Sequence, residues 1–551
     1  MRAEHRRIAA LTCIAVLAAV APPARAAWQP AGVDLTRPRL IVRAAAVPGV
    51  QARLDREPYR TLLRELWLRI RQADAVALDD HTIAAARIKA RAARNLAFAL
   101  LVDRMLVDDQ AVPFASAERS AAADRVRAWL ATMYSRSRLA VPPPLGGWDR
   151  DISTSEELLN YASAYDTLLG AGVDLGADEA AIVANLTALA GELYENYVDP
   201  ASASGYAALH QNNHRSKTGA ALATAAIALA DYTPPAGSDP RGVREPARWL
   251  AYGLEQIDLV MRYALGSGDG AYGEGPFYLR YASQNLLPFW RAWDSLLGDL
   301  PLPPPSLTTP NWWRHPLLAR QMRWALDMTL PDGSLAPTDD GNPGRAYYFG
   351  VAPLTPATAW RWANAPDRFD TDGNVSLAAD ALVHYDDAIV PAPPDGSPNA
   401  FYFEGGQAAF RSGWDAGAVL AIVQGEHGVA AEFGRAPDGR GVAPQSHEHA
   451  EPGAFLLHAY GERLALDPGY FNFTDRGLVG KPQDHNLILI DGAGPGDYLS
   501  ASLAWLADPF GPPPADGQAT LTEALDADGL AAVRVVSRYG VDPARVERRF
   551  L

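Results

Sequence analysis

The sequence predicts an α+β multidomain protein in which helical hairpins, closed into a ring or a solenoid, precede an antiparallel β-sandwich. Apolar residues recur at helical spacing from about Leu54 to Val390. Beyond Pro391 the apolar runs become short, and Gly and Pro punctuate them, which is typical of strands joined by tight turns. The length of 551 residues accommodates two or more such domains.

The first residues have the pattern of a secretory signal peptide, which we assign to 1–26. Arg2, Arg6 and Arg7 form a basic start. The apolar run from Ile8 to Val20 has the length of a signal core and is too short for a membrane span. Ala24-Arg25-Ala26 matches a cleavage site, so we expect a periplasmic or secreted mature chain.

Composition excludes several classes of function. The only cysteine, Cys13, lies in the signal segment, so the mature chain has no disulfide and no thiolate ligand. The net charge is −15, and loss of four Arg and one Glu with the signal brings it near −18. No basic stripe points to a nucleic-acid partner, and no other apolar run is long enough for a membrane span. An anionic ligand is not excluded, because a basic cleft can lie in an acidic protein.

Residues 27–390 form the predicted helical domain. Ser153-Thr154-Ser155-Glu156 has the pattern of a capping box before a helix. Proline-rich stretches at 142–144 and 301–305 separate helices. Further helices are expected near 81–107, 119–134, 178–197, 216–231, 244–265, 278–296 and 315–328.

Residues 391–400 are the predicted linker, and 401–551 the predicted β-sandwich domain. The sequence stops at Leu551 inside a strand-like stretch, so we expect a fragment whose final sheet is incomplete. Strands are expected at Phe401–Phe403, Ala418–Val423, Ala454–His458, Leu487–Ile490 and Leu530–Ser537.

A histidine-rich segment in this second domain is the strongest functional signal. Of eleven histidines in the chain, four fall between positions 447 and 485. His449, Asp467 and His485 offer the nitrogen and oxygen donors that zinc accepts. His447 would lie beside His449 on the same face of a strand. The alternative is a set of histidines satisfied by backbone hydrogen bonds, which is what we expect of His458.

Two motifs in the helical domain add to this signal. Asn213 and His214 precede a helical run, and the free N–H groups at such a helix start favour a carboxylate, although simple N-capping would explain them as well. Tyr278 and Tyr281 share a helix face. A tyrosine in a cationic cleft can carry a proton if its pKa is lowered; the alternative is a pair of core aromatics.

Together these motifs resemble the heparinase II/III-like polysaccharide lyases. The resemblance covers nearly the whole mature chain. It implies an N-terminal (α/α) toroid followed by stacked antiparallel sheets, and cleavage of uronic-acid polysaccharides by β-elimination. Its most specific parts are 447–455, Gly461-Glu462, Asp467-Pro468-Gly469 and His485-Asn486.

The resemblance also implies roles for the motif residues. Asn213 and His214 would neutralise the uronate carboxylate. Tyr278 would be the catalytic acid, or both base and acid, and His447 the second proton carrier. The partner would be an anionic polysaccharide or oligosaccharide.

A zinc ion is implied as well. His449, Asp467 and His485 would hold a Zn²⁺ that shapes the site rather than attacks substrate. Glu451 stands where an aspartate is common in the family, which leaves one supporting contact open. The identity of the metal also stays open, because this donor set accepts other divalent ions.

Several assignments stay open at this level. Tyr281 and Tyr470 are further candidates for the proton carrier. Arg215, Lys217 and Arg280 would either bind anionic groups of the substrate or be solvated surface charges. The particular polysaccharide, endo or exo cleavage and the oligomeric state are not legible in the sequence.

Two other functions compete with the lyase. A glycoside hydrolase on a helical toroid needs two carboxylates across the scissile bond, and Asp269, Glu274, Asp339 and Asp340 are candidates. A glycan-binding protein without activity would keep the fold and bind without shortening the polymer.

Overall fold

The structure is a computed structural model of the whole chain. Its described residues are 33–133, 150–198, 213–264, 268–297, 311–344, 347–352, 355–364, 377–425, 434–435, 441–442, 447, 449–471, 478–495, 519–527, 530–539 and 544–551. The expected signal peptide and the proline-rich breaks at 142–144 and 301–305 lie outside them.

Helices dominate the first part of the chain, as predicted, and all seven expected segments contain one. In the described ranges the α-helices are α2 (Val47–Gln51), α3 (Tyr59–Gln72), α4 (Ile83–Leu101), α5 (Ser116–Ala131), α6 (Arg150–Gly170), α7 (Glu179–Val198), α8 (Asn213–Ala228), α9 (Pro246–Ala264), α10 (Gly275–Leu297), α11 (Pro316–Asp327), α12 (Pro356–Asn364) and α13 (Ala378–His384). None of the described helices is both long and apolar enough to cross a membrane.

The predicted capping box is wrong, because Ser153–Glu156 lies inside α6. The Ser155 hydroxyl group donates a hydrogen bond to the Ile152 carbonyl (2.8 Å) within the same helix. Glu156 accepts from Arg87 Nε of α4 (2.6 Å) and pairs with Lys217 Nζ of α8 (2.9 Å). The polar run therefore joins neighbouring helices and does not start one.

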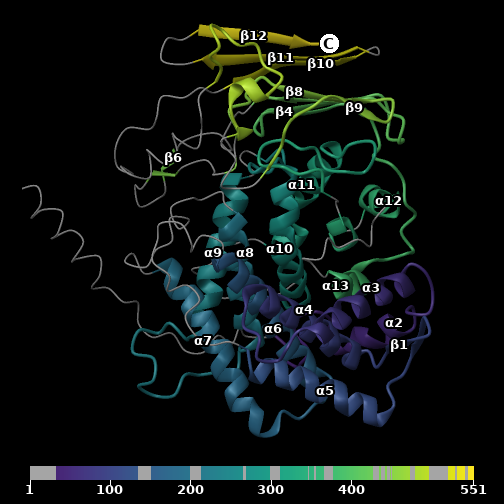
Figure 1. Cartoon of the computed structure of the whole chain (residues 1–551), viewed down its shortest axis with the longest axis vertical. Helices are drawn as coiled ribbons and strands as arrows, with labels where there is room; N and C mark the ends of the chain where they lie inside the picture. Colours follow the sequence, from purple (N-terminus) through teal and green to yellow (C-terminus); the bar gives the residue numbers. More distant parts are fainter. Residues whose placement is uncertain are drawn as a thin grey trace, which may run out of the picture.

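Alternate helices form an inner and an outer series, as expected of an (α/α) toroid (Figure 1). Helix α6 packs between α4 and α8, and α8 packs in turn on α10. Helices α5, α7 and α9 lie against this inner series. Burial agrees with the arrangement, since every residue of α8 is buried, whereas α5 buries only one stripe, at Ala123, Val126, Trp129 and Leu130.

Small residues allow the inner and outer helices to approach closely. A Cβ atom placed on Gly253 of α9 would lie 2.5 Å from the Gly219 carbonyl oxygen of α8, and one on Gly219 would lie 2.9 Å from the Gly253 oxygen. Only glycine fits at this crossing, because such distances lie well inside van der Waals contact.

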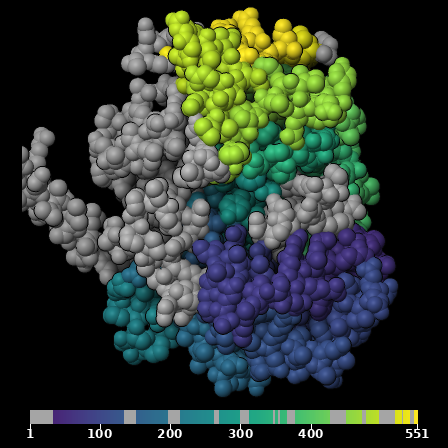
Figure 2. Space-filling view, in the orientation of Figure 1, coloured from purple at the N-terminus to yellow at the C-terminus, as the bar shows by residue number. Residues whose placement is uncertain are grey.

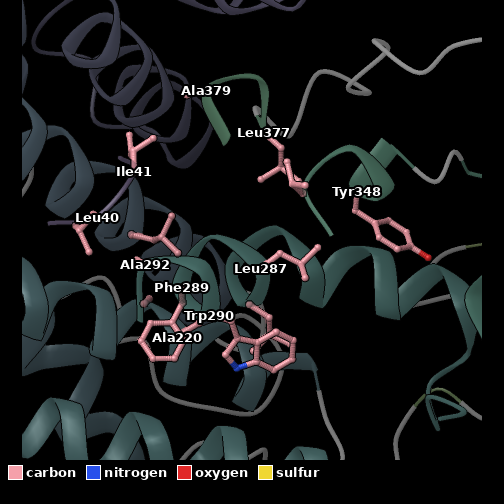
Figure 3. Close-up of a cluster of buried hydrophobic side chains, with 14 of the residues drawn as sticks. Leu40, Ile41, Ala220, Leu287, Phe289, Trp290, Ala292, Tyr348, Leu377 and Ala379 are labelled. Atoms are coloured by element: carbon pink, nitrogen blue, oxygen red, sulfur yellow. The ribbon is translucent and has the colours of Figure 1, made fainter. Parts of the chain in front are cut away.

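Helix α13 brings the end of the helical domain back to its beginning. Asp380 of α13 forms a buried bidentate ion pair with Arg94 of α4 (2.7 and 2.8 Å). Arg291 of α10 donates to Nδ1 of His384 in α13 (3.0 Å), and burial lowers the pKa of His384 well below its usual value. The hydrophobic core continues across this closure (Figure 3), where it includes Leu40, Ile41, Ala220, Leu287, Phe289, Trp290, Leu377 and Ala379.

Two antiparallel sheets make up the second part, which confirms the sandwich. One sheet has the order β3-β4-β5-β8-β9 and the other the order β10-β11-β12. Their facing side chains form a separate apolar cluster of Ala408, Val423, Ala519, Leu521, Val533 and Val535. The strands are β3 (Ala400–Tyr402), β4 (Gln407–Arg411), β5 (Leu420–Gln424), β8 (Phe455–Ala459), β9 (Glu462–Ala465), β10 (Ala519–Ala527), β11 (Leu530–Tyr539) and β12 (Ala544–Phe550).

The described residues also contain two pairs of short strands. Strand β1 (Met105–Val107) pairs with β2 (Gln110–Val112), and β6 (Gly434–Arg435) pairs with β7 (Gly441–Val442). The strand expected at Leu487–Ile490 is absent, since only Ile490 takes part in an isolated bridge. Strands β4, β9 and β10 were not among the expected strands, whereas β12 is the strand-like stretch before Leu551.

The sheets lie against one end of the helical domain (Figure 2), and buried polar contacts join the two. Tyr402 donates its hydroxyl hydrogen to Asp327 Oδ2 (2.6 Å), and Trp324 donates from Nε1 to Gln407 Oε1 (2.6 Å). Asp269, one of the carboxylates considered for a hydrolase, accepts from the backbone N–H groups of Glu404 and Gly405 (2.8 and 2.9 Å). Its carboxylate therefore anchors backbone at the domain boundary.

Candidate functional site

The predicted site residues come together where the inner helices meet the first sheet. Asn213 and His214 are the first described residues of α8, and Tyr278 lies in the first turn of α10. His447 comes from the β-domain and reaches both helices. All four side chains are buried, with exposed fractions of 0, 5, 7 and 5% in that order.

Asn213 is held by Glu274. Its backbone N–H donates to Glu274 Oε2 (2.7 Å), and its side-chain Nδ2 lies 3.4 Å from Glu274 Oε1 and 3.4 Å from His447 Nε2. The Oδ1 atom of Asn213 is buried without a partner among the described residues. The amide therefore keeps one side open for a further hydrogen bond.

Glu274 lies deep in the site. Burial raises its pKa to about 8, although the hydrogen bonds from Asn213 and Tyr272 oppose this shift. The carboxyl group is therefore largely protonated at neutral pH. A protonated carboxyl group adds no negative charge and can donate a hydrogen bond.

His214 pairs with a carboxylate of α6. Its Nδ1 lies 3.0 and 2.9 Å from the two oxygens of Asp151, which is itself only 1% exposed. A carboxylate accepts hydrogen bonds, so this contact assigns the hydrogen to Nδ1 of the ring. Asp151 thus orients the imidazole from behind.

The rings of Tyr278 and His447 are stacked. Their centroids lie 3.7 Å apart and their planes differ by 17°. Burial, followed by the neighbouring acidic groups, raises the pKa of Tyr278 well above its usual value. Tyr278 is thus a neutral phenol, whereas the sequence argument required a lowered pKa.

The other two tyrosines occupy different places. Tyr281 lies with its ring over Lys217 Nζ, 3.8 Å from the ring centroid, and away from His447. Tyr470 is next to Tyr278, at 6.4 Å between ring centroids. The geometry therefore favours Tyr278 over Tyr281 as the group beside His447, with Tyr470 at the rim of the same cluster.

Asp340 links the two histidines of the β-domain motif. Its Oδ2 lies 2.8 Å from His447 Nδ1, and its Oδ1 lies 2.9 Å from His449 Nε2. The carboxylate is completely buried. The predicted strand through this motif is absent, because the described residues from His447 to Ala454 are irregular and β8 begins only at Phe455.

The expected metal ligands cluster, and Glu451 joins them. His449, Glu451, Asp467 and His485 each offer one donor atom, and these atoms all lie within 4.8 Å of one another. His485 Nδ1 lies 2.8 Å from Asp467 Oδ2 and 3.2 Å from Glu451 Oε2. Ligands that share a tetrahedral zinc with bonds of ~2.0–2.1 Å are about 3.3 Å apart, which matches these spacings.

One orphaned nitrogen atom also fits a metal at this place. His449 Nδ1 is buried and has no hydrogen-bond partner in the described structure, whereas His485 faces the carboxylates of Glu451 and Asp467 with its Nδ1. Because His449 Nε2 faces Asp340, its Nδ1 is the nitrogen with a lone pair to offer. The donor set of two imidazoles and two carboxylates suits zinc.

The cationic residues of the Asn213 and Tyr278 motifs are not solvated surface charges. Arg215, Lys217 and Arg280 are 4, 0 and 6% exposed. Burial lowers the pKa of Lys217 to about 8, while its ion pair with Glu156 opposes the shift. Lys217 therefore serves the contact between the inner helices α6 and α8.

The sequence did not predict three carboxyl groups of this site, Asp151, Glu274 and Asp340, as hydrogen-bond partners of its histidines and of the Asn213 amide. Nothing in the sequence pairs them with these groups, because the contacts connect positions 61–109 residues apart. Glu451 could have been found as a ligand, since it follows His449 by two residues. His458 differs from its prediction: it is buried, and neither ring nitrogen has a hydrogen-bond partner among the described residues.

The loop 337–341 of the helical domain contacts three segments of the β-domain. Asp339 donates from its backbone N–H to Glu451 Oε1 (3.0 Å), Asp340 donates to the His447 carbonyl (3.0 Å), and the Gly341 carbonyl accepts from Tyr470 N–H (2.9 Å). Asp339 has a positive φ of 55°, which these contacts must maintain.

The carboxylates considered for a hydrolase do not face an open gap. Asp340 Oδ2 lies 2.8 Å from Nδ1 of His447, and Glu274 Oε1 lies 3.6 Å from Nε2 of the same ring. An imidazole thus fills the space between the two carboxyl groups. A hydrolase would need that space for the sugar and a water molecule.

No family model and no curated protein matches the sequence. Solved structures do match. A crystal structure of heparinase III is 13% identical, with 94% of this chain and 76% of that chain covered and a TM-score of 0.49. A heparinase III with methylated lysines is 11% identical, with 84% of this chain covered and a TM-score of 0.46, and the match spans only 61% of that chain.

A chondroitin AC lyase of Streptomyces coelicolor A3, in complex with chondroitin sulphate, matches as well. It is 14% identical, with 92% of this chain and 69% of that chain covered and a TM-score of 0.44. The chain is thus similar over most of its length to solved structures of heparinases and of a chondroitin lyase.

Replacing Gly469 should test the contact between loop 337–341 and the β-domain. Gly469 has φ +58°, and a Cβ there would lie 2.2 Å from the Gly341 oxygen. Gly469→Ala should lower the free energy of unfolding by ~2–4 kcal/mol, the sum of a left-handed backbone and an overpacked contact. Chemical denaturation measures it.

Gly461→Ala is the matched control. Gly461 has φ +78° but nothing within 4 Å of its Cβ position, so only the backbone cost of ~1–2 kcal/mol applies. Equal losses in both variants would show that the Gly469–Gly341 approach is not a tight one.

The raised pKa of Glu274 predicts a pH dependence of stability. Between its ordinary value of 4.5 and about 8, the unfolded chain ionises Glu274 while the folded chain does not. The free energy of unfolding should therefore fall through this window relative to Glu274→Gln, by at most ~5 kcal/mol, and level off above it. Denaturation at a series of pH values checks this. Parallel curves for the two proteins would contradict the raised pKa.

Proposed function

We propose that this chain is a polysaccharide lyase that cleaves uronic-acid-containing polysaccharide by β-elimination. The observation that carries the proposal is the stacked pair of Tyr278 and His447, 3.7 Å between centroids, with the Asn213 amide directly beside it. Two proton carriers from two domains and a polar group beside them are the minimum that this reaction needs.

The chemistry explains the presence of Asn213 and His214. The proton at C5 of a uronate is weakly acidic, because its removal next to a carboxylate creates a second negative charge. Preorganised donors offset that charge, and one such donor contributes ~3 kcal/mol. The Asn213 amide, held by Glu274, is suited to this task. The His214 ring is suited to it when both nitrogens carry hydrogen, with Nδ1 donating to Asp151 and Nε2 donating to the substrate.

Glu274 favours an anionic substrate because it is neutral. Its pKa of about 8 keeps it largely protonated at neutral pH, so it adds no negative charge beside Asn213. The Asn213 Nδ2 group stays beside Glu274 Oε1 and His447 Nε2, at 3.4 Å from each. An ionised Glu274 would repel the substrate carboxylate.

The two proton carriers receive different roles. His447 donates from Nδ1 to Asp340, so its Nε2 presents a lone pair and can take the C5 proton. Tyr278 stays protonated because burial raises its pKa, so it can protonate the O4 leaving group. No covalent intermediate with the protein is required.

Zinc would be held by His449, Glu451, Asp467 and His485. Its charge would fix these donors in place and would not act on the substrate. The protein's own residues then do the chemistry. We further propose that the chain acts in the periplasm or outside the cell, on the basis of the signal-like residues 1–26.

Product absorbance tests the activity. A lyase product carries a C4=C5 double bond conjugated to the carboxylate, which absorbs ultraviolet light, whereas a hydrolase product does not. On a panel of uronic-acid polysaccharides, absorbance should rise with one of them. Tyr278→Phe and His447→Ala should each lower kcat by ~10²–10⁴-fold, the usual contribution of a positioned acid or base.

Tyr281→Phe is the matched control for Tyr278→Phe, because it removes the same atom three residues along the helix. It should keep activity within about threefold of the unmodified protein, a change of well under 1 kcal/mol in the barrier. Sugar release without absorbance would refute the lyase and favour hydrolysis. Binding without chain shortening would favour a glycan-binding protein.

The metal proposal predicts a zinc stoichiometry of one per chain after purification. Glu451→Gln removes one anionic ligand and should weaken zinc binding beyond the ~10–100-fold that losing an outer-shell partner costs. Competition with a chromophoric chelator measures the affinity. Glu462→Gln, an exposed position on β9, is the control. Equal zinc affinity in both variants would exclude Glu451 as a ligand.

A further inference from the structure

Asp340 of the helical domain contacts two histidines of the β-domain, His447 and His449. One carboxylate oxygen lies 2.8 Å from His447 Nδ1 and the other 2.9 Å from His449 Nε2. The Asp340 N–H also donates to the His447 carbonyl (3.0 Å). The side chain is fully buried, so these bonds form away from water.

This arrangement assigns a tautomer to each histidine. An ionised carboxylate only accepts hydrogen bonds, so each ring nitrogen that faces it carries hydrogen. His447 is left with a lone pair on Nε2, next to Asn213 and Tyr278. His449 is left with a lone pair on Nδ1, the orphaned atom on the side of Glu451 and His485.

The two assignments are complementary. His447 needs a lone pair on Nε2, where it faces the Asn213 amide. His449 needs its lone pair on Nδ1, where it would bind the metal together with the other donors. One carboxylate satisfies both needs, because its two oxygens are used separately. Neighbouring Asp339 strengthens the link through its N–H bond to Glu451 Oε1 (3.0 Å).

We propose that Asp340 is a positioning residue that fixes His447 and His449 in complementary tautomers and so couples the proton carrier to the metal donor set. The proposal rests on the proposed lyase function for its kinetic part alone. It assigns Asp340 no contact with the substrate.

Asp340→Asn tests this with almost no change of shape. The amide has one accepting oxygen and one donating NH₂ group, so it can satisfy only one of the two imidazoles in its present tautomer. We expect kcat to fall by at least ~100-fold with KM changed less than about threefold, or zinc affinity to fall by ~10–100-fold, or both.

Asp269→Asn is the matched control. Asp269 also joins the helical domain to the β-domain, but it accepts only from backbone N–H groups, at Ala271, Glu404 and Gly405. It should lower stability and leave kcat and zinc affinity unchanged. If Asp340→Asn changes stability alone, as this control does, Asp340 is only a structural contact and the proposal is overturned.

The tautomers of the two histidines can also be measured directly, without a substitution of Asp340. In ¹⁵N-histidine NMR spectra of the unmodified protein, assigned with single histidine variants, His447 should carry hydrogen on Nδ1 and His449 on Nε2. The opposite tautomer at either ring would overturn the proposal. If no polysaccharide is cleaved, the lyase function fails, whereas the NMR and zinc measurements still decide the role of Asp340.

Discussion

The contact of Asp340 with two histidines is the interaction on which the rest of the site depends. It is made across the domain boundary, by a loop of the helical domain that would be strained on its own, since Asp339 has φ 55°. The toroid supplies Asn213, His214 and Tyr278, while irregular segments of the β-domain supply His447 and the cluster of His449, Glu451, Asp467 and His485. Neither domain holds a complete site, so the fold must place the two parts to within a hydrogen bond.

Burial gives these groups their chemistry. It keeps Glu274 and Tyr278 protonated and removes the water that would otherwise compete for the Asn213 amide. The same burial lowers the stability of the fold, because charged and polar groups lose their contacts with water. Hydrogen bonds offset this loss, as the one between Asp151 and His214 does. A site of this kind depends on its supporting carboxylates as much as on the groups that would touch the substrate.

Much of the fold was predictable, because helical spacing and turn residues are local signals. The capping box failed because Glu156 serves Arg87 and Lys217 on neighbouring helices, which a local pattern does not reveal. The motif residues were found because they lie in short local patterns such as Asn213-His214 and His447-Glu448-His449. Asp340 and Asp151 were not assigned, since a carboxylate in a loop or at the start of a helix has no pattern that names its distant partner. The pKa of Tyr278 is raised instead of lowered, because the ring is buried beside acidic groups and not in a cationic cleft.

The most direct test of this account is a double-mutant cycle between Tyr278 and His447, with kcat measured on a cleaved polysaccharide for Tyr278→Phe, His447→Ala and the double variant. Residues that act as one unit lose most of the activity when either is removed. We therefore expect the double variant to be at most about tenfold slower than the slower single variant. Losses that multiply in full would mean that the two groups act independently and would contradict a shared proton-transfer site at the domain boundary.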